Sequence, residues 1–209
     1  MRSYICLSNK SPIQNYNMLQ DISPAEVTGP VSDTELAYAI DLLESTKIDL
    51  HEAVEGLSAE QLTARPDPER WSVAECLEHI VLVEEGIFGR LQPTMQKPED
   101  PEKRAEIQVS DLYLTKALRS RKTGISSPEP FVPTGRFGNT EAILAAFDEQ
   151  RDRVIAYAQS APGNWRTHYF KHLVYGTIDA YQTLLLFAGH CERHRKQIEE
   201  IKVTPGFPQ

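Results

Sequence analysis

The amino-acid sequence predicts an all-α protein, a four-helix bundle with a long crossover before the third long helix. Apolar residues recur at helical spacing in four long stretches, and these stretches open with residues that cap helices. No stretch shows the sustained polar–apolar alternation that is typical of a strand. At 209 residues, with 40% apolar and 25% charged residues, the chain is long enough for one well-packed domain of ordinary composition.

We place the bundle domain at residues 32–203, between a poorly ordered N-terminal tail at 1–31 and a short C-terminal tail at 204–209. The N-terminal tail is rich in Ser, Asn and Pro and carries no helical periodicity. Met18 is an alternative start of the chain. Pro205 ends the last helical pattern.

The first long helix is expected to open at the capping box Ser32–Glu35. Its apolar face includes Ile48 and Leu50, and Gly56 is expected to stop the helix. His51 lies near its end among acidic residues, so we expect this histidine at the surface.

A second capping box at 58–61 predicts a short helical turn. The second long helix starts at a third capping box, Ser72–Glu75, with Trp71 just outside it. We expect it to end at Pro93, because proline removes a backbone donor. His79 lies on this helix, where a single histidine is more often a buried structural residue than a metal ligand.

The crossover, residues 96–138, is irregular and rich in proline, with a short helix predicted at 111–121. A segment of this length between helices is usually a crossover or a functional flap. The third long helix is capped at Asn139 and ends near Ala161. An aromatic-rich connection at 168–176 then leads into the fourth helix.

The fourth helix carries His190 and His194, four residues apart. Residues at this spacing project from one helix face, so two imidazoles can bind a single metal ion; chance placement on a charged helix is the alternative. His168 and His172 form a rival pair, where a stable helix is less expected. In a four-helix bundle His79 can meet His190 and His194, and three imidazoles leave a coordination position open, which is typical of a reactive metal site.

Composition argues against several other classes of protein. The net charge of −8, without a basic stripe, argues against a nucleic-acid binder. No run of about 18 apolar residues suggests a membrane span. Three cysteines, Cys6, Cys76 and Cys191, are too sparse for a disulfide framework and fit a reducing, cytoplasmic compartment.

Several motifs carry a family resemblance. Residues 71–79 (WSVAECLEH) resemble the W-S-x-x-E-x-L-x-H opening of the second helix in the DinB-like, damage-inducible superfamily, which includes the bacillithiol S-transferases. Residues 172–176 (HLVYG) are similar to that family's H-P-x-x-G segment, and 179–182 with 190–198 resemble its last helix. The similarity covers residues 32–202, and the motifs in this order are specific.

The resemblance implies a bundle, often a homodimer, with a divalent metal (zinc or nickel) held by His79, His190 and His194. Cys191 stands beside the first ligand of the last helix, where polar residues are commoner in the family. Together with Cys76 it raises the idea of a thiolate near the metal, although a small buried hydrophobe is the simpler interpretation of each cysteine.

The activity implied by the resemblance is metal-assisted transfer of a low-molecular-weight thiol to an electrophilic small molecule, in detoxification or stress response. Arg193 would bind an anionic group of the thiol cofactor or form a structural salt bridge. Glu75 and Gln197 would orient imidazoles or serve as ordinary cap and surface residues. The alternatives are a metal-binding stress-response bundle without turnover, and a helical bundle with coincidental histidines.

Overall fold

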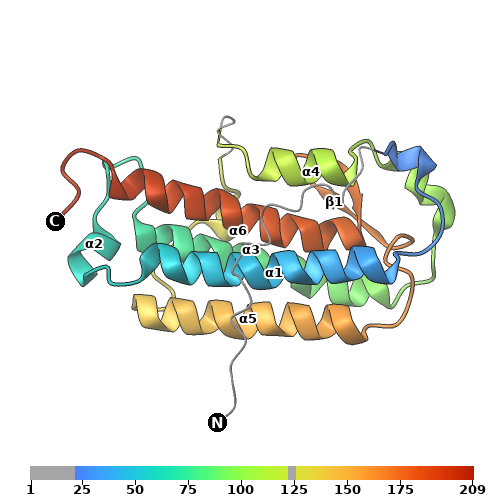
Figure 1. The fold of residues 1–209 in the computed structure, drawn as a ribbon, viewed down its shortest axis with the longest axis horizontal. Helices are drawn as coiled ribbons and strands as arrows, with labels where there is room; N and C mark the ends of the chain where they lie inside the picture. The colour runs from blue at the N-terminus through green and yellow to red at the C-terminus, as the bar shows by residue number, and fades with distance from the viewer. Residues whose placement is uncertain (1–21, 122–125) are drawn as a thin grey trace, which may run out of the picture.

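The structure is a computed structural model that describes residues 22–121 and 126–209. Within these residues, four helices of 21 to 23 residues build the bundle: α1 (Asp33–Val54), α3 (Val73–Met95), α5 (Thr140–Ser160) and α6 (Ala180–Lys202) (Figure 1). The predicted four-helix bundle is confirmed. The predictions made for residues 1–21, with Cys6 and Met18 among them, lie outside the described residues.

The long helices do not follow one another around the bundle. α1 packs against α6 and α5, and α3 packs against the same two helices, so α1 and α3 stand at opposite corners. α3 and α5 start at the end of the bundle near the short helix α2 (Ala59–Thr63), whereas α1 and α6 start at the other end (Figure 1). Because α3 and α5 point the same way, the chain between them must return along the bundle, which is the predicted crossover.

The crossover contains η4 (Pro101–Glu106), α4 (Asp111–Leu118) and η5 (Glu129–Phe131). α4 packs along α6, and η5 packs against α3. Gly189 makes the first contact possible, because a Cβ at this position would lie 2.8 Å from the Cβ of Leu118. Gly189, which interrupts the apolar pattern of α6, therefore lies where α4 packs against this helix.

Residues 22–31 contain the short turn η3 (Pro24–Glu26), which lies beside η4. The carbonyl oxygen of Pro24 accepts a hydrogen bond from Arg104 Nε at 3.2 Å. This contact joins the segment before α1 to the crossover.

The predicted helix starts agree with the structure: capping boxes are present at Ser32, Ser58 and Ser72, and Asn139 caps α5. Two details of the sequence analysis are wrong. α3 continues through Pro93 to Met95, because a proline in the last turn removes one backbone hydrogen bond while Leu91 and Met95 on either side are buried. Ile48, which was predicted to lie on the apolar face of α1, is 59% exposed, so the buried face of this helix is narrower than its apolar residues suggest.

The aromatic-rich connection is a hairpin, where the sequence predicted no strand. β1 (Tyr169–His172) pairs antiparallel with β2 (Gly176–Asp179). Strands of four residues are too short to display alternation, which explains the error. α6 begins only at Ala180, with a capping box between Asp179 and Gln182.

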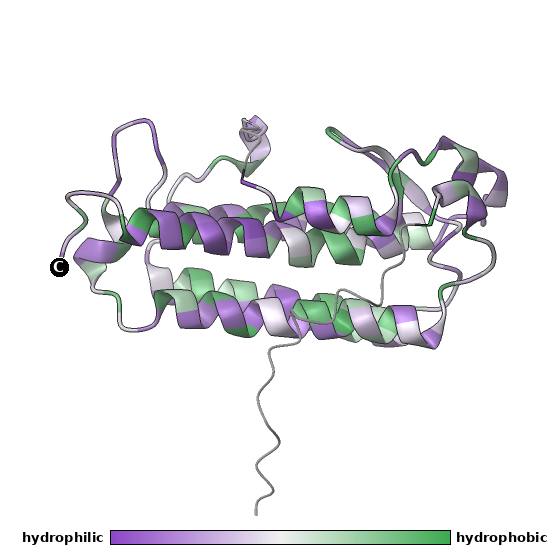
Figure 2. Ribbon diagram, turned by 45° about the horizontal axis from the view of Figure 1, so that its top comes forward, coloured by the Kyte–Doolittle hydropathy of each residue, from purple (hydrophilic) through white to green (hydrophobic). Residues whose placement is uncertain are grey.

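The core consists of two hydrophobic clusters along the bundle axis. Between them lies a polar layer in which Arg151 pairs with Glu84, both fully buried. Arg151 Nη1 also donates to the carbonyl of Leu43 at 2.7 Å and to Thr46 Oγ1 at 2.8 Å, so both hydrogens of this nitrogen have an acceptor. Figure 2 shows hydrophobic and hydrophilic residues sharing each long helix, as in amphipathic helices of a bundle. No helix of the described chain is long and apolar enough to cross a membrane.

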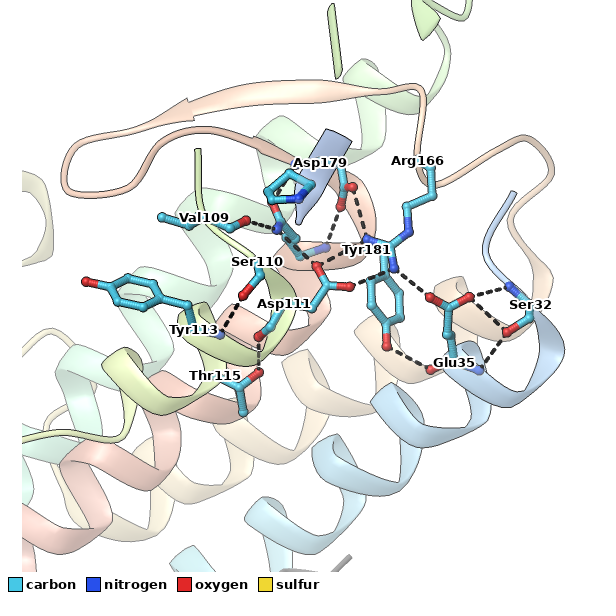
Figure 3. A network of polar contacts seen from close by, with 12 residues as sticks. Ser32, Glu35, Val109, Ser110, Asp111, Tyr113, Thr115, Arg166, Asp179 and Tyr181 are labelled. Atoms are coloured by element: carbon cyan, nitrogen blue, oxygen red, sulfur yellow. Dashed lines mark hydrogen bonds and ion pairs between the residues drawn. The ribbon is translucent and has the colours of Figure 1, made fainter. Parts of the chain in front are cut away.

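A second polar network fastens the bundle end where α1 and α6 begin (Figure 3). Arg166, 2% exposed, bonds to Asp111 at 2.7 Å, Glu35 at 2.7 Å and Asp179 at 3.2 Å. Arg104 reaches the same Asp179 carboxylate at 2.8 Å. The network therefore joins α1, α4, the hairpin and the cap of α6 at one point.

Candidate metal centre

Three imidazoles from two facing helices meet in the half of the bundle away from the Arg166 network. His190 Nε2 lies 3.2 Å from His79 Nε2 of α3 and 3.2 Å from His194 Nε2 one turn further along α6. Among the described residues these three histidines form a group, hereafter the cluster, whose candidate ligand atoms all lie within 4.8 Å of one another. The structure thus brings together the three histidines that the sequence singled out.

The packing of α3 against α6 positions these side chains. His79 and His194 are each 6% exposed, and His190 is partly buried. Trp71, just before the cap of α3, covers the group: its ring centroid lies 4.7 Å from that of His79 and 6.1 Å from that of His194. The Trp that opens the family motif is therefore a wall of the cluster.

Hydrogen bonds on the far side of two rings determine which nitrogen faces the cluster. His79 Nδ1 lies 2.7 Å from the carbonyl oxygen of Phe131, and His194 Nδ1 lies 3.0 Å from Gln197 Oε1. Both partners are oxygens that only accept, so each Nδ1 carries the proton and each Nε2 presents a lone pair. His190 Nε2 faces both lone pairs and can donate a proton to only one of them.

This donor set fits a divalent cation. Without one, at least one of these buried Nε2 lone pairs has no hydrogen-bond donor, which is unfavourable. Neutral imidazoles whose other nitrogen donates to an oxygen are common ligands of zinc and similar ions. The residues present therefore suit a metal held by three nitrogens.

Electrostatics keeps the imidazoles neutral. Burial lowers the pKa of His79, and it lowers the pKa values of His190 and His194 well below the ordinary value. Neighbouring imidazoles and the charge of Arg193 lower the pKa values of His190 and His194 further, and the charge of Arg121 also lowers the pKa of His194. Neutral rings are the form that binds a metal, so protons compete weakly at neutral pH.

The crossover is fastened beside the cluster by Glu78. This carboxylate, 2% exposed, accepts three backbone N–H bonds, from Thr134 at 3.1 Å, Gly135 at 2.9 Å and Arg136 at 3.0 Å. Glu78 precedes His79, whose ring bonds to Phe131 at the start of the same segment. Two adjacent residues of α3 therefore hold residues 131–136 against the cluster.

The other residues predicted near the site have separate places. Gln197 contacts His194, as the sequence analysis considered, whereas Glu75 caps α3 through Ser72 and pairs with Arg65. Arg193, from α6, is half-buried; burial and the charge of Arg121 lower its pKa. Its positive charge acts on the imidazoles of both α6 histidines.

Neither described cysteine belongs to the cluster. Cys76 and Cys191 are both buried free thiols, and burial raises the pKa of each to about 12. Cys191 belongs to one of the two hydrophobic clusters of the core, and its Sγ lies 3.5 Å from the carbonyl oxygen of Thr46. Both are small buried residues, as the simpler interpretation held.

The remaining histidines make other contacts. His51 pairs with Asp148 at 2.8 Å on a partly exposed helix face. His168, before β1, lies between the carbonyls of Asn164 and Lys97, at 2.9 and 3.0 Å. His172 is the last residue of β1. Because four residues span about 13 Å in an extended chain, His168 and His172 do not converge as two histidines four apart on a helix would.

Comparison with known proteins places the chain in a family. The sequence profile of the DinB superfamily matches residues 42–198. YuaE of Bacillus subtilis (strain 168), an uncharacterized protein, is 22% identical over 162 residues, which cover 77% of this chain and 95% of YuaE. The chain belongs to the DinB superfamily.

A solved structure shares the fold. YfiT from Bacillus subtilis, described as a probable metal-dependent hydrolase with an unusual four-helix bundle topology, matches with a TM-score of 0.58 at 18% identity. The match covers 88% of this chain and 94% of YfiT. At this identity the likeness concerns the fold, and it agrees with the arrangement of α1, α3, α5 and α6.

Proposed function

We propose that His79, His190 and His194 hold one divalent metal ion, zinc or nickel, in a reactive site. The observation that carries this proposal is the convergence of three imidazole nitrogens, two of them with the tautomer needed for binding. A zinc-like ion with three protein ligands keeps a position for an external ligand and lowers the pKa of a water or thiol bound there.

We infer that the external ligand is a low-molecular-weight thiol, which is transferred to an electrophilic small molecule. In this reaction the sulfur forms a bond to an electrophilic carbon, the leaving group departs with its electron pair, and the thiol proton passes to solvent. The support is the family resemblance of the motifs around His79 and His194, together with the cationic surroundings of the cluster.

The chain's own residues would select the thiol and exclude competing nucleophiles. Arg193 places positive charge beside the imidazoles of both α6 histidines, which suits a carboxylate or phosphate on the thiol cofactor. Cys76 and Cys191 are buried with raised pKa values, so the attacking sulfur would come from the cofactor. Trp71 closes one side of the cluster and limits access of water to it.

The test is conjugation of a model electrophile, 1-chloro-2,4-dinitrobenzene, by the zinc- or nickel-loaded protein with a panel of small thiols. We expect turnover that needs both metal and thiol, stops on chelation and is absent in His79→Asn. His51→Ala changes a histidine outside the cluster and should leave turnover intact. Binding of metal without turnover of any thiol would favour the non-catalytic metal-binding stress protein. Hydrolysis of ester substrates without thiol would favour a metal-dependent hydrolase, the activity suggested for YfiT.

The family resemblance also supports a homodimer in the cytoplasm with a role in stress response. Sedimentation of the metal-loaded protein at micromolar concentration tests the first of these proposals. A species with the mass of one chain, 23.6 kDa, would contradict it.

A further inference from the structure

We propose that Arg121, a residue of the crossover, is a positioning residue for the metal centre: it holds Gln197 in the amide orientation that makes His194 a metal ligand. This proposal rests on the proposed metal site. It adds that a residue outside the two helices that carry the ligands determines how well one of those ligands binds metal. It is drawn from a chain of contacts that runs from the surface of α6 to the cluster.

The contacts are specific in their direction. Arg121 Nη1 donates to Gln197 Oε1 at 3.1 Å, and the same oxygen lies 3.0 Å from His194 Nδ1. The opposite edge of the guanidinium bonds to Glu200, with Nη2 at 3.1 Å from Oε2. Arg121 is therefore clamped between two residues of α6, and its side chain is only 26% exposed.

A guanidinium fixes the amide because it has donors and no acceptor. If the Gln197 amide turned by 180°, its NH₂ group would face the donors of Arg121 and that hydrogen bond would be lost. With the oxygen held toward Arg121, the amide can only accept from His194. The Nδ1 of His194 must then carry the ring proton, and Nε2 keeps the lone pair that faces the cluster.

Without Arg121 the amide is free to reverse. Its NH₂ group would then donate to His194 Nδ1, the ring proton would move to Nε2, and His194 would lose the lone pair that binds metal. Loss of such an outer hydrogen bond typically lowers metal affinity 10- to 100-fold. Coulomb's law alone predicts the reverse, because removing a positive charge near a divalent cation should tighten binding. The sign of the effect therefore separates the two explanations.

The test is a competition titration of metal-free protein with Zn²⁺ and a chelating indicator. We expect Arg121→Met to weaken zinc binding about 10-fold. Glu200→Gln is the matched control, since it removes the other partner of Arg121 and leaves the Gln197 contact; its zinc affinity should stay within about twofold of wild type. Melting of each metal-free variant reports whether folding is intact.

Gln197→Glu supplies a rescue, because a carboxylate presents only acceptors and needs no arginine to orient it. In this background Arg121→Met should no longer weaken zinc binding. The ¹⁵N spectrum of metal-free wild type should show His194 protonated at Nδ1, and that of Arg121→Met a mixture of tautomers.

Two results would overturn the inference. One is zinc affinity that is unchanged or tighter in Arg121→Met. The other is an equal loss of affinity on Arg121→Met with and without the Gln197→Glu substitution, which would indicate a merely structural arginine. Failure of wild type itself to bind zinc would instead refute the proposed function.

Discussion

Glu78 and His79, neighbours in α3, bond to the two ends of one segment of the crossover. Glu78 accepts the backbone amides of residues 134–136, while His79 donates to the carbonyl oxygen of Phe131 at 2.7 Å. The loop and the imidazole therefore hold each other in place. This relationship couples the irregular part of the chain to the candidate metal centre.

Changing Glu78 should weaken both the fold and the site. In Glu78→Gln one carboxylate oxygen becomes an NH₂ group facing backbone donors, so at least one buried hydrogen bond to a charge is lost. We expect a decrease of about 2–3 kcal/mol in the free energy of unfolding, measured by urea denaturation. Zinc affinity should fall as well, because the segment that carries the Phe131 carbonyl is held less firmly against His79.

Glu85→Gln is the control for this change. Glu85 pairs with Arg136 of the same segment, but its side chain is 35% exposed, so the loss should stay below about 1 kcal/mol. Equal losses in the two variants would refute the special role of Glu78.

Gly189 should be irreplaceable, whereas another helical glycine should not. Gly189→Ala places a methyl group 2.8 Å from Leu118 Cβ and must push α4 away from α6. We expect a cost of about 1–3 kcal/mol in unfolding free energy. Gly89→Ala in α3 points into open space and should stabilise the protein by up to about 1 kcal/mol. Thermal melting of both variants distinguishes them, and a neutral Gly189→Ala would show that α4 does not approach α6 this closely.

The two core cysteines should be chemically silent in the folded protein. Burial raises the pKa of both Cys76 and Cys191 to about 12, so at pH 8 both are protonated as well as inaccessible. In a Cys6→Ser variant, which leaves only these two, a chromogenic disulfide reagent should react with neither thiol until denaturant is added. Rapid reaction of one thiol in the native, metal-free protein, blocked by zinc, would reinstate a thiolate at the metal centre.

The sequence was most informative where structure is local. Capping boxes at Ser32 and Ser72 and helical periodicity predicted the long helices, since both depend on residues within a few turns. The spacing of His190 and His194 predicted a shared face, and the bundle architecture supplied His79. The hairpin escaped prediction because its four-residue strands show no period.

The contacts around the imidazoles could not be predicted in the same way. The partner of His79 is a backbone carbonyl 52 positions away, and Arg121 lies 76 positions from Gln197. Phe131 and Arg121 both lie in the irregular crossover. A backbone carbonyl has no sequence signature, and an arginine in such a segment is ordinarily expected to be a solvated surface residue. Nothing in the sequence distinguishes Glu78 from other helical glutamates, because its partners are backbone amides of residues 134–136.

The central claim is that three histidines of this chain hold one metal ion. Elemental analysis of purified, tag-free protein tests it most directly, alongside His194→Ala and the control His51→Ala. We predict about one zinc or nickel ion per chain in wild type and in His51→Ala, and loss of that ion in His194→Ala. Wild-type protein without bound metal, even after reconstitution with zinc and with nickel, would contradict the claim.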